Sequence, residues 1–122
     1  MPVYRAPVQE TLFVLNNVLG YERFGNLAGF ADASADVLEA ILAEGAKLAE
    51  NVLHPANRDG DEHGCIRNAD ATVTTPESFK DAYRQYREGG WLGLAVDAEY
   101  GGQGLPYVVH TAVGEYFSSA NM

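Results

Sequence analysis

The stretch from Gly89 to Pro106, GGWLGLAVDAEYGGQGLP, combines flexible joints with apolar bulk. It holds six of the chain's thirteen glycines and its only tryptophan. The Gly-Gly-Gln-Gly run at residues 101–104 lies just ahead of a helical pattern, where backbone N–H groups can meet an anion. A dinucleotide-binding fingerprint needs a preceding strand and the spacing G-x-G-x-x-G, and the sequence has neither. The local pattern therefore favours a tight turn between two helices over a phosphate cradle.

Helical periodicity appears in four stretches around this turn, whereas the alternation expected of a strand appears in none. The four stretches are Pro7–Leu19, Ala35–Leu53, Pro76–Glu88 and the segment from about Leu105 to the last residue. Together they predict an all-α fold, an up-and-down helical bundle.

Local signals set the ends of these helices. Gly20 suits the end of the first helix, and Pro55 predicts that the second helix ends at about His54. Thr75 is a candidate N-cap for the third helix, with proline at its first position. Gly45 falls inside the apolar stripe of the second helix, which predicts the close approach of another helix there.

The first and fourth helices carry more apolar surface than their sequence neighbours would cover. The fourth helix also has no stop signal before Met122, so we expect a truncated element. Because exposed apolar faces attract other surfaces, we expect the chain to pack against further segments and to form a homo-oligomer.

Composition narrows the class of protein. The chain has 122 residues, enough for one domain or part of one, and its apolar fraction of 47% is that of a folded protein. Its net charge of −9 argues against nucleic acid or an anionic membrane surface as the main partner. No run approaches the roughly 18–20 apolar residues of a membrane span. The absence of an apolar leader and the single Cys65, which excludes an internal disulfide, predict a cytoplasmic protein.

Several residues have the chemistry of a metal or catalytic site, but their spacing is poor. His54, His63 and Cys65 lack the second close pair that a zinc site commonly has. The run from Asp59 to Asp70 resembles a calcium loop, but histidine replaces one oxygen ligand and aspartate replaces the final bidentate glutamate. A solvated loop is the better interpretation, and we expect no metal site. Glu115 is a candidate general base, although a single helical glutamate usually faces solvent.

Taken together, the motifs resemble a known family. The runs GWLGL at residues 90–94 and EYGGQGLP at residues 99–106 are similar to a signature near the N-terminus of flavin-dependent acyl-CoA dehydrogenases. YRAP at residues 4–7, followed by LFVL at residues 12–15, resembles the leading extension of the long branch of this family, which includes the methylmercaptopropionyl-CoA dehydrogenase type.

The resemblance covers essentially the whole chain, in order. The loop NRDGD at residues 57–61, then Gly64 and Cys65, is similar to the same branch, and so is the last helix from Glu115 onward. One departure is Ala98, where the family often has proline, and losing a loop proline costs less than about 1 kcal/mol.

The resemblance implies an N-terminal helical domain, followed in the family by a middle β domain and a C-terminal helical domain. Residues 1–31 would be an extension with one helix, and residues 32–122 the family's N-terminal domain, truncated in its last helix. Enzymes of this family use a glutamate to remove a proton from the carbon next to the thioester carbonyl of an acyl-CoA. The neighbouring carbon gives a hydride to FAD. Electrons then go to an electron-transferring flavoprotein. Flavin contacts and the catalytic glutamate lie mainly in the other domains.

For this chain the resemblance implies no catalytic residue, no bound FAD and no dehydrogenase activity in isolation, and Glu115 does not match the position of the base. Trp91, Leu92 and Leu94 would anchor the glycine-rich connector in the core. The loop nearest to substrate and cofactor would comprise Tyr100, Gly101, Gly102, Gln103, Gly104 and Leu105. The alternative is a stand-alone helical protein-interaction module that keeps the sequence of a dehydrogenase domain.

Overall fold

Residues 3–122 are described by a computed structural model of the chain. Within this range the α-helices are α1 (Val8–Phe13), α2 (Ala35–Leu48), α3 (His54–His63), α4 (Glu77–Glu88) and α5 (Tyr107–Ala120). The strands β1 (Ile66–Arg67) and β2 (Val73–Thr74) pair antiparallel, with Ile66 opposite Thr74. Two π-helical turns, Val14–Val18 and Ala49–Leu53, follow α1 and α2 directly.

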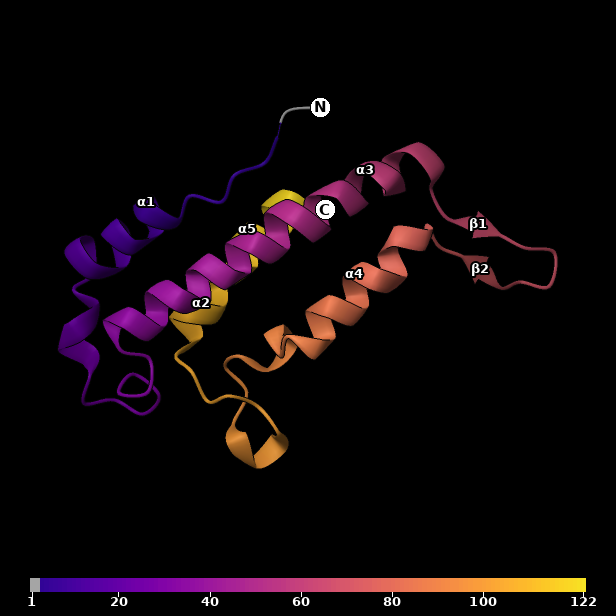
Figure 1. The fold of residues 1–122 in the computed structure, drawn as a ribbon. Coiled ribbons are helices and arrows are strands. Elements are labelled where there is room, and N and C mark those ends of the chain that lie inside the picture. The colour runs from indigo at the N-terminus through magenta and orange to yellow at the C-terminus, as the bar shows by residue number, and fades with distance from the viewer. Residues whose placement is uncertain (1–2) are drawn as a thin grey trace.

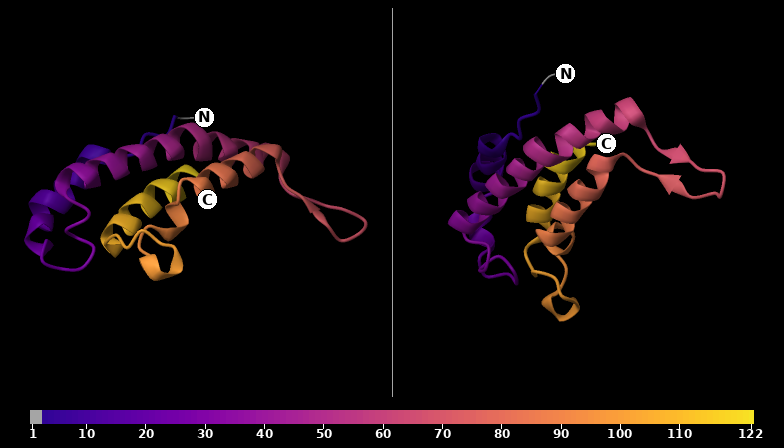
Figure 2. Two further views of the ribbon diagram at one scale, coloured as in Figure 1. Left: turned by 60° about the horizontal axis from the view of Figure 1, so that its bottom comes forward. Right: turned by 45° about the vertical axis from the view of Figure 1, so that its right-hand side comes forward.

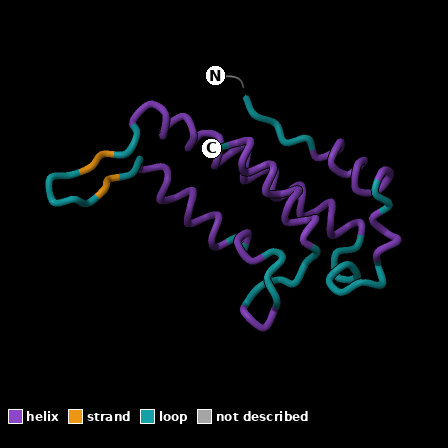
Figure 3. Tube along the Cα trace, turned by 180° about the vertical axis from the view of Figure 1, so that it is seen from behind, coloured by secondary structure: helices purple, strands orange, loops and turns teal. Residues whose placement is uncertain are grey.

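The helices form the up-and-down arrangement that the sequence predicts. α2 and α3 make one long rod, α1 and α4 run in the opposite direction, and α5 runs along α2 in the same direction as α2 (Figure 1). The hairpin of β1 and β2 projects from the end of the rod (Figure 2). Seen from behind, α1 and α4 lie on opposite sides of the α2–α5 pair (Figure 3). The prediction of an all-α fold is therefore confirmed, with one small hairpin added.

The core lies where α2 meets α5. Its largest fully buried side chains are Leu38, Leu42, Val109, Val113 and Tyr116. A Cβ placed on Gly45 would lie 3.2 Å from Cγ1 of Val113, so the glycine does permit the close helix approach that its position predicts. The ring of Phe117 on α5 packs edge-on against Trp91 and Tyr86, with centroids 5.4 and 5.3 Å away. These contacts hold the end of α4 onto α5.

The prediction that Pro55 ends the second helix is wrong. The rod continues through Pro55, which occupies the first turn of α3. Proline lacks an N–H and its ring clashes with the carbonyl four residues back. The π-helical turn Ala49–Leu53 precedes it, and the His54 N–H donates to the Ala49 carbonyl, five residues back. A π-turn widens the backbone locally, which is how a helix accommodates such a residue.

The expected loop over residues 59–70 is only partly a loop. Residues 59–63 belong to α3 and residues 66–67 form β1, so the segment does not fold as a calcium loop. The sequence also missed the hairpin. Its turn is held by the Asn68 side chain, which donates to the hydroxyls of Thr72 and Thr74 at 3.0 and 2.9 Å. Strands of two residues are too short to show alternation in a sequence.

Two helix ends differ from the expected ones. Pro76, not Thr75, is the N-cap residue of α4, and the cap bond comes from another helix. The Asp59 carboxylate on α3 accepts from the Ser78 backbone N–H at 3.3 Å and from the Ser78 hydroxyl. α5 begins at Tyr107 rather than Leu105, because Pro106 precedes it, and ends at Ala120.

The expectation of uncovered apolar surface is confirmed for the first helix and wrong for the fourth. Phe13, the last residue of α1, and Val18, at the end of the π-helical turn that follows, are 60% and 62% exposed. By contrast, the apolar face of α5 is buried against α2, and Val109 and Tyr116 are fully covered. No helix within residues 3–122 has the length and apolar character needed to cross a membrane.

Candidate functional site

The glycine-rich connector between α4 and α5 folds back on itself through backbone hydrogen bonds. The Gln103 N–H donates to the Gly93 carbonyl, and the Leu105 N–H donates to the Leu94 carbonyl, both at 2.9 Å. The Gly104 N–H donates to the Val96 carbonyl at 2.9 Å. The connector is therefore a closed, internally bonded unit rather than an open loop.

Two features of the backbone explain why glycine occupies residues 101, 102 and 104. Gly101 and Gly104 have φ values of 82° and 63°, a region that favours residues without a Cβ. Gly102 packs so tightly that a Cβ there would lie 2.0 Å from the Val96 carbonyl oxygen. A side chain at residue 102 would force the two halves of the connector apart.

The hydrogen bonds also decide between the two interpretations of the Gly-Gly-Gln-Gly run. The N–H groups of residues 101–105 all donate to carbonyls of the connector itself, those of Gly101 and Gly102 to Ala98 and Asp97. An anion cradle needs several unpaired N–H groups that converge on one point. The run is the tight turn that the local pattern favours, and it offers no such cradle.

The residues of the loop that we expected nearest to substrate and cofactor, residues 100–105, have different surroundings in the structure. Tyr100 is 78% exposed at the tip of the connector. Gln103 turns inward, where its amide Nε2 donates to the Gly90 carbonyl at 3.1 Å. Leu105 packs half-buried against the core cluster, and the Gly104 carbonyl closely approaches Gly29.

The anchoring of the connector is only partly as expected. Leu94 is buried and Trp91 packs half-buried against the core, which agrees with the expectation. Leu92 is 53% exposed and anchors nothing, so that part is wrong. Residues 91–93 form a short 3₁₀ turn, in which the Trp91 side chain packs against the core while the Leu92 side chain is exposed.

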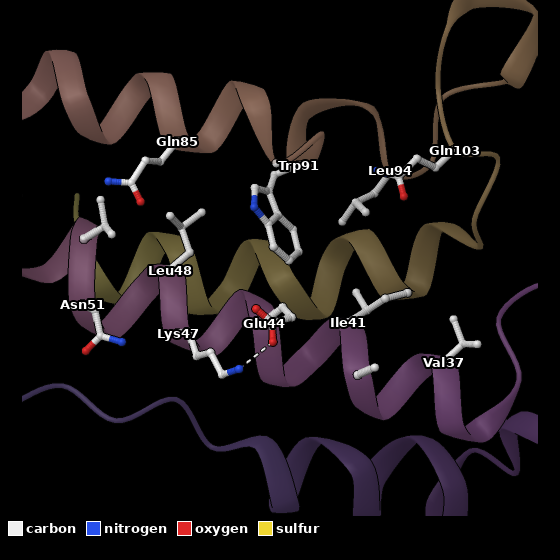
Figure 4. Close-up of a pocket in the computed structure, with 13 residues that line it drawn as sticks. Val37, Ile41, Glu44, Lys47, Leu48, Asn51, Gln85, Trp91, Leu94 and Gln103 are labelled. Carbon is white, nitrogen blue, oxygen red and sulfur yellow. Dashed lines mark hydrogen bonds and ion pairs between the residues drawn. The ribbon is translucent and has the colours of Figure 1, made fainter.

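Beside the connector, a groove of about 720 Å³ separates α2 from α4. Figure 4 shows Val37, Ile41 and Leu48 along the α2 wall, with Trp91 and Leu94 of the connector facing them. Gln103 is the one residue of the expected proximal loop that lines this groove. The groove thus joins the connector to the long face of α2.

The groove has the chemistry of a packing surface. Its walls are mostly apolar, and its polar rim includes the amides of Asn51, Gln85 and Gln103. Its two charged side chains, Glu44 and Lys47, pair with each other at 2.5 Å (Figure 4). Both charged groups are exposed and form an ion pair with each other, so neither is placed to act as a catalytic acid or base. The groove is therefore a surface for apolar packing.

The candidate metal and catalytic residues lie apart. The His54 ring lies tilted beside the Tyr4 ring, with centroids 6.1 Å apart, whereas His63 and Cys65 are exposed at the hairpin end. His63 Nδ1 instead pairs with the Asp59 carboxylate at 2.7 Å. Across residues 3–122, no three His, Cys, Asp or Glu side chains gather as metal ligands would. Glu115 is exposed on α5, on the side that faces α1.

Three hydrogen bonds that tie the N-terminal segment to the bundle were not predicted from the sequence. Glu50 accepts from the Arg5 guanidinium at 2.6 Å and from the Ala6 N–H at 3.0 Å. Burial raises the pKa of Glu50, but the hydrogen bonds from Arg5 and Ala6 outweigh it and hold that pKa below its ordinary value. The buried Tyr116 hydroxyl donates to Thr11 at 2.7 Å, and burial raises the pKa of this tyrosine. No local pattern marks such pairs, because their members lie far apart in the chain.

Comparison with known proteins gives the same family as the motifs. The model of the acyl-CoA dehydrogenase N-terminal domain matches residues 36–122. The chain is 33% identical over 119 residues to a 3-methylmercaptopropionyl-CoA dehydrogenase of Ruegeria pomeroyi, which covers 98% of this chain and 20% of the relative. It is 31% identical over 122 residues to the broad-specificity linear acyl-CoA dehydrogenase FadE5 of Mycobacterium tuberculosis, covering 99% of the chain and 20% of the relative.

A butyryl-CoA dehydrogenase of Syntrophomonas wolfei is 32% identical over 78 residues, 62% of this chain and 12% of the relative. The chain therefore spans about a fifth, or less, of the length of these curated relatives. All three are named as dehydrogenases of acyl-CoA compounds, which are oxidoreductases. The resemblance carried by the glycine-rich connector and the N-terminal segment is confirmed, and the chain belongs to the acyl-CoA dehydrogenase family, whose N-terminal domain it carries.

Proposed function

We propose that the chain acts as the N-terminal helical domain of an FAD-dependent dehydrogenase that introduces a double bond between the α and β carbons of an acyl-CoA. The observation that carries this proposal is the alignment of 98% of the chain with 3-methylmercaptopropionyl-CoA dehydrogenase. The electron acceptor of such an enzyme would be an electron-transferring flavoprotein. The enzyme would be a cytoplasmic homo-oligomer.

Within that enzyme the chain would form part of the wall of the active site and would transfer no proton. The N–H groups of residues 101–105 all donate to carbonyls within the connector, so we assign these five residues no contact with a flavin diphosphate. Residues 100–105 would form a rigid wall near the substrate and cofactor, with Gly102 setting how closely the connector folds. The base would come from elsewhere in the polypeptide.

The proposed boundaries follow the contacts of the N-terminal segment. Residues 32–122 would be the family domain, and residues 1–31 an extension that docks onto it. Glu50 holds the start of that extension through Arg5 and Ala6, and Tyr116 holds α1 through Thr11. The extension would thus fold together with the domain.

The isolated chain should bind no flavin and oxidise no acyl-CoA. The test is to purify the 122-residue chain in the presence of excess FAD, record its visible spectrum, and assay dye reduction with acyl-CoA thioesters of several lengths. We expect no flavin absorbance in the protein peak and no acyl-CoA-dependent reduction. Bound flavin together with turnover would overturn the proposal that catalysis needs the remaining domains.

A further inference from the structure

Two loops that are far apart in the chain meet at the end of the bundle opposite the hairpin. One comprises residues 20–33, just before α2, and we call it the 20–33 loop; the other is the glycine-rich connector (Figures 1 and 2). A Cβ placed on Gly29 would lie 2.5 Å from the Gly104 carbonyl oxygen and 3.5 Å from the backbone of Leu105 and Pro106. The two backbones therefore touch with no side chain between them.

Aromatic side chains hold the 20–33 loop in place. The buried Tyr21 hydroxyl donates to the Ala33 carbonyl at 2.9 Å, which joins the two ends of the loop. The Phe30 ring lies with its centroid 5.2 Å from that of Tyr21 and 5.8 Å from that of Phe24, and it packs half-buried against the core cluster. Since Phe30 follows Gly29 directly, these contacts fix the backbone at Gly29.

The connector meets this loop with a segment that is itself fixed. The Gly104 N–H donates to the Val96 carbonyl at 2.9 Å, so the connector holds this residue from the other side. Pro106 is buried where α5 begins, which limits movement toward the helix. A displacement of Gly104 would therefore be passed on to the rest of the connector.

Glycine at residue 29 meets two separate requirements. Its φ of 83° lies in the region that favours residues without a Cβ, and the closeness of Gly104 leaves no room for a side chain. Gly20, in the same loop, has a φ of 64°, but a Cβ there would meet only the flexible Arg23 side chain, at 3.5 Å. Gly20 therefore meets the backbone requirement alone.

We propose that the 20–33 loop sets the position of the glycine-rich connector, with Gly29 as the positioning residue. This inference rests on the proposed function, in which residues 100–105 form a wall near the acyl-CoA. Gly29 would act through the connector rather than on the substrate: a side chain there would displace Gly104 and with it the wall, and so change how the acyl group fits. The loop precedes the family-model match at residues 36–122, so the N-terminal extension would support the site from outside the common domain.

Hydrogen exchange of the 122-residue chain, followed by NMR, tests this contact without an enzymatic assay. The reporters are the amides of residues 103–105, which donate to the carbonyls of residues 93, 96 and 94. We expect Gly29→Ala to speed their exchange by about tenfold relative to the amides of α2, because a displaced connector opens these bonds more often. The amides of α2 correct for any loss of overall stability.

Two further variants separate the contact from backbone strain. Gly20→Ala is the matched control, because it places alanine at a similar φ away from the connector, and it should change the exchange ratio by less than about twofold. Tyr21→Phe removes the bond to the Ala33 carbonyl and loosens the loop without adding bulk, so it should raise the ratio by about threefold. Equal ratios for Gly29→Ala and Gly20→Ala, or no effect of Tyr21→Phe, would overturn the positioning role.

Kinetics of a chimera test the consequence for the substrate. In the chimera, this chain replaces the matching segment of the Ruegeria pomeroyi 3-methylmercaptopropionyl-CoA dehydrogenase. We expect Gly29→Ala to raise KM for acyl-CoA by about fivefold or more and to leave kcat within about twofold, since a wall contributes binding rather than chemistry. Gly20→Ala should leave both unchanged.

The outcomes of the two experiments are distinguishable. A Gly29→Ala variant with faster exchange at residues 103–105 but an unchanged KM would overturn the link between the loop and the substrate. A wild-type chimera without turnover would contradict the proposed function instead, and the exchange experiment would still decide whether the 20–33 loop positions the connector.

Discussion

The Tyr116 hydroxyl donates a 2.7 Å hydrogen bond to the hydroxyl of Thr11, across 105 positions of the sequence. Tyr116 is completely buried in α5, and Thr11 lies on α1. This bond joins α1 to α5. It gives α1 a polar contact with the core in addition to its apolar packing.

Thr11→Val should destabilise the chain by about 1–3 kcal/mol, because it leaves the buried Tyr116 hydroxyl without its partner. Tyr116→Phe should cost less, since it removes the donor that needs satisfying. In the double variant, Thr11→Val should add little to the effect of Tyr116→Phe. Urea unfolding of the four proteins measures this, and purely additive effects would contradict the proposed coupling.

Gly102→Ala should destabilise the chain by more than about 1 kcal/mol, because the new Cβ would lie 2.0 Å from a backbone oxygen. Backbone, unlike the end of a flexible side chain, cannot easily move away. Gly114→Ala in α5 is the control: apart from neighbouring backbone of its own helix, no heavy atom lies within 4 Å of its Cβ position, and alanine in a helix interior should stabilise by about 0.5–1 kcal/mol. Thermal melts that rank the two variants the other way would refute the steric role of Gly102.

Gly45→Leu should cost about 1–3 kcal/mol through overpacking of the α2–α5 contact. The Cβ alone would lie 3.2 Å from Val113 and 3.6 Å from the Trp91 ring, and leucine adds three further carbons. Gly45→Ala should have a much smaller effect, because Val113 needs to move only slightly. Chemical denaturation compares the two, and equal stability of both variants would show that the helices do not meet closely there.

Glu50 should make stability depend on pH in acid. Its pKa is lower in the folded chain than the ordinary 4.5, so its contribution is complete above pH 4.5 and disappears as the pH falls through the lower folded value. Glu50→Gln should lose about 1 kcal/mol at neutral pH and show a weaker loss of stability toward acid. Glu44→Gln, in an exposed pair with Lys47, is the control and should behave like the wild type. Parallel acid curves for wild type and Glu50→Gln would contradict the assignment.

The sequence predicted the helices well because their stabilising contacts follow a regular period. The stripe of α2 and the position of Gly45 within it correctly indicated both a helix and a close neighbour. The glycine-rich connector was identified as a tight turn because no strand precedes its glycines. Local patterns sufficed in these places since the determining interactions lie within a few residues.

The predictions from sequence that proved wrong or incomplete have a common cause, because they depend on contacts between segments that are distant in the chain. Pro55 normally ends a helix, but a π-turn before it lets the rod continue. The first turn of α4 donates to the carboxylate of Asp59 on α3, which lies nineteen positions before Ser78. The cover over α5 comes from α2, which no pattern in the α5 sequence indicates. The groove between α2 and α4 likewise arises only when the two helices diverge in space.

The most direct test places the chain in an enzyme of its family. In a chimera, this chain replaces the matching segment of the 3-methylmercaptopropionyl-CoA dehydrogenase of Ruegeria pomeroyi, and flavin absorbance and acyl-CoA-dependent dye reduction are measured. We expect a flavin-loaded, active chimera whose activity falls when Gly102→Val opens the connector. A folded and soluble chimera with neither flavin nor turnover would show that these helices do not serve as the N-terminal domain of such an enzyme.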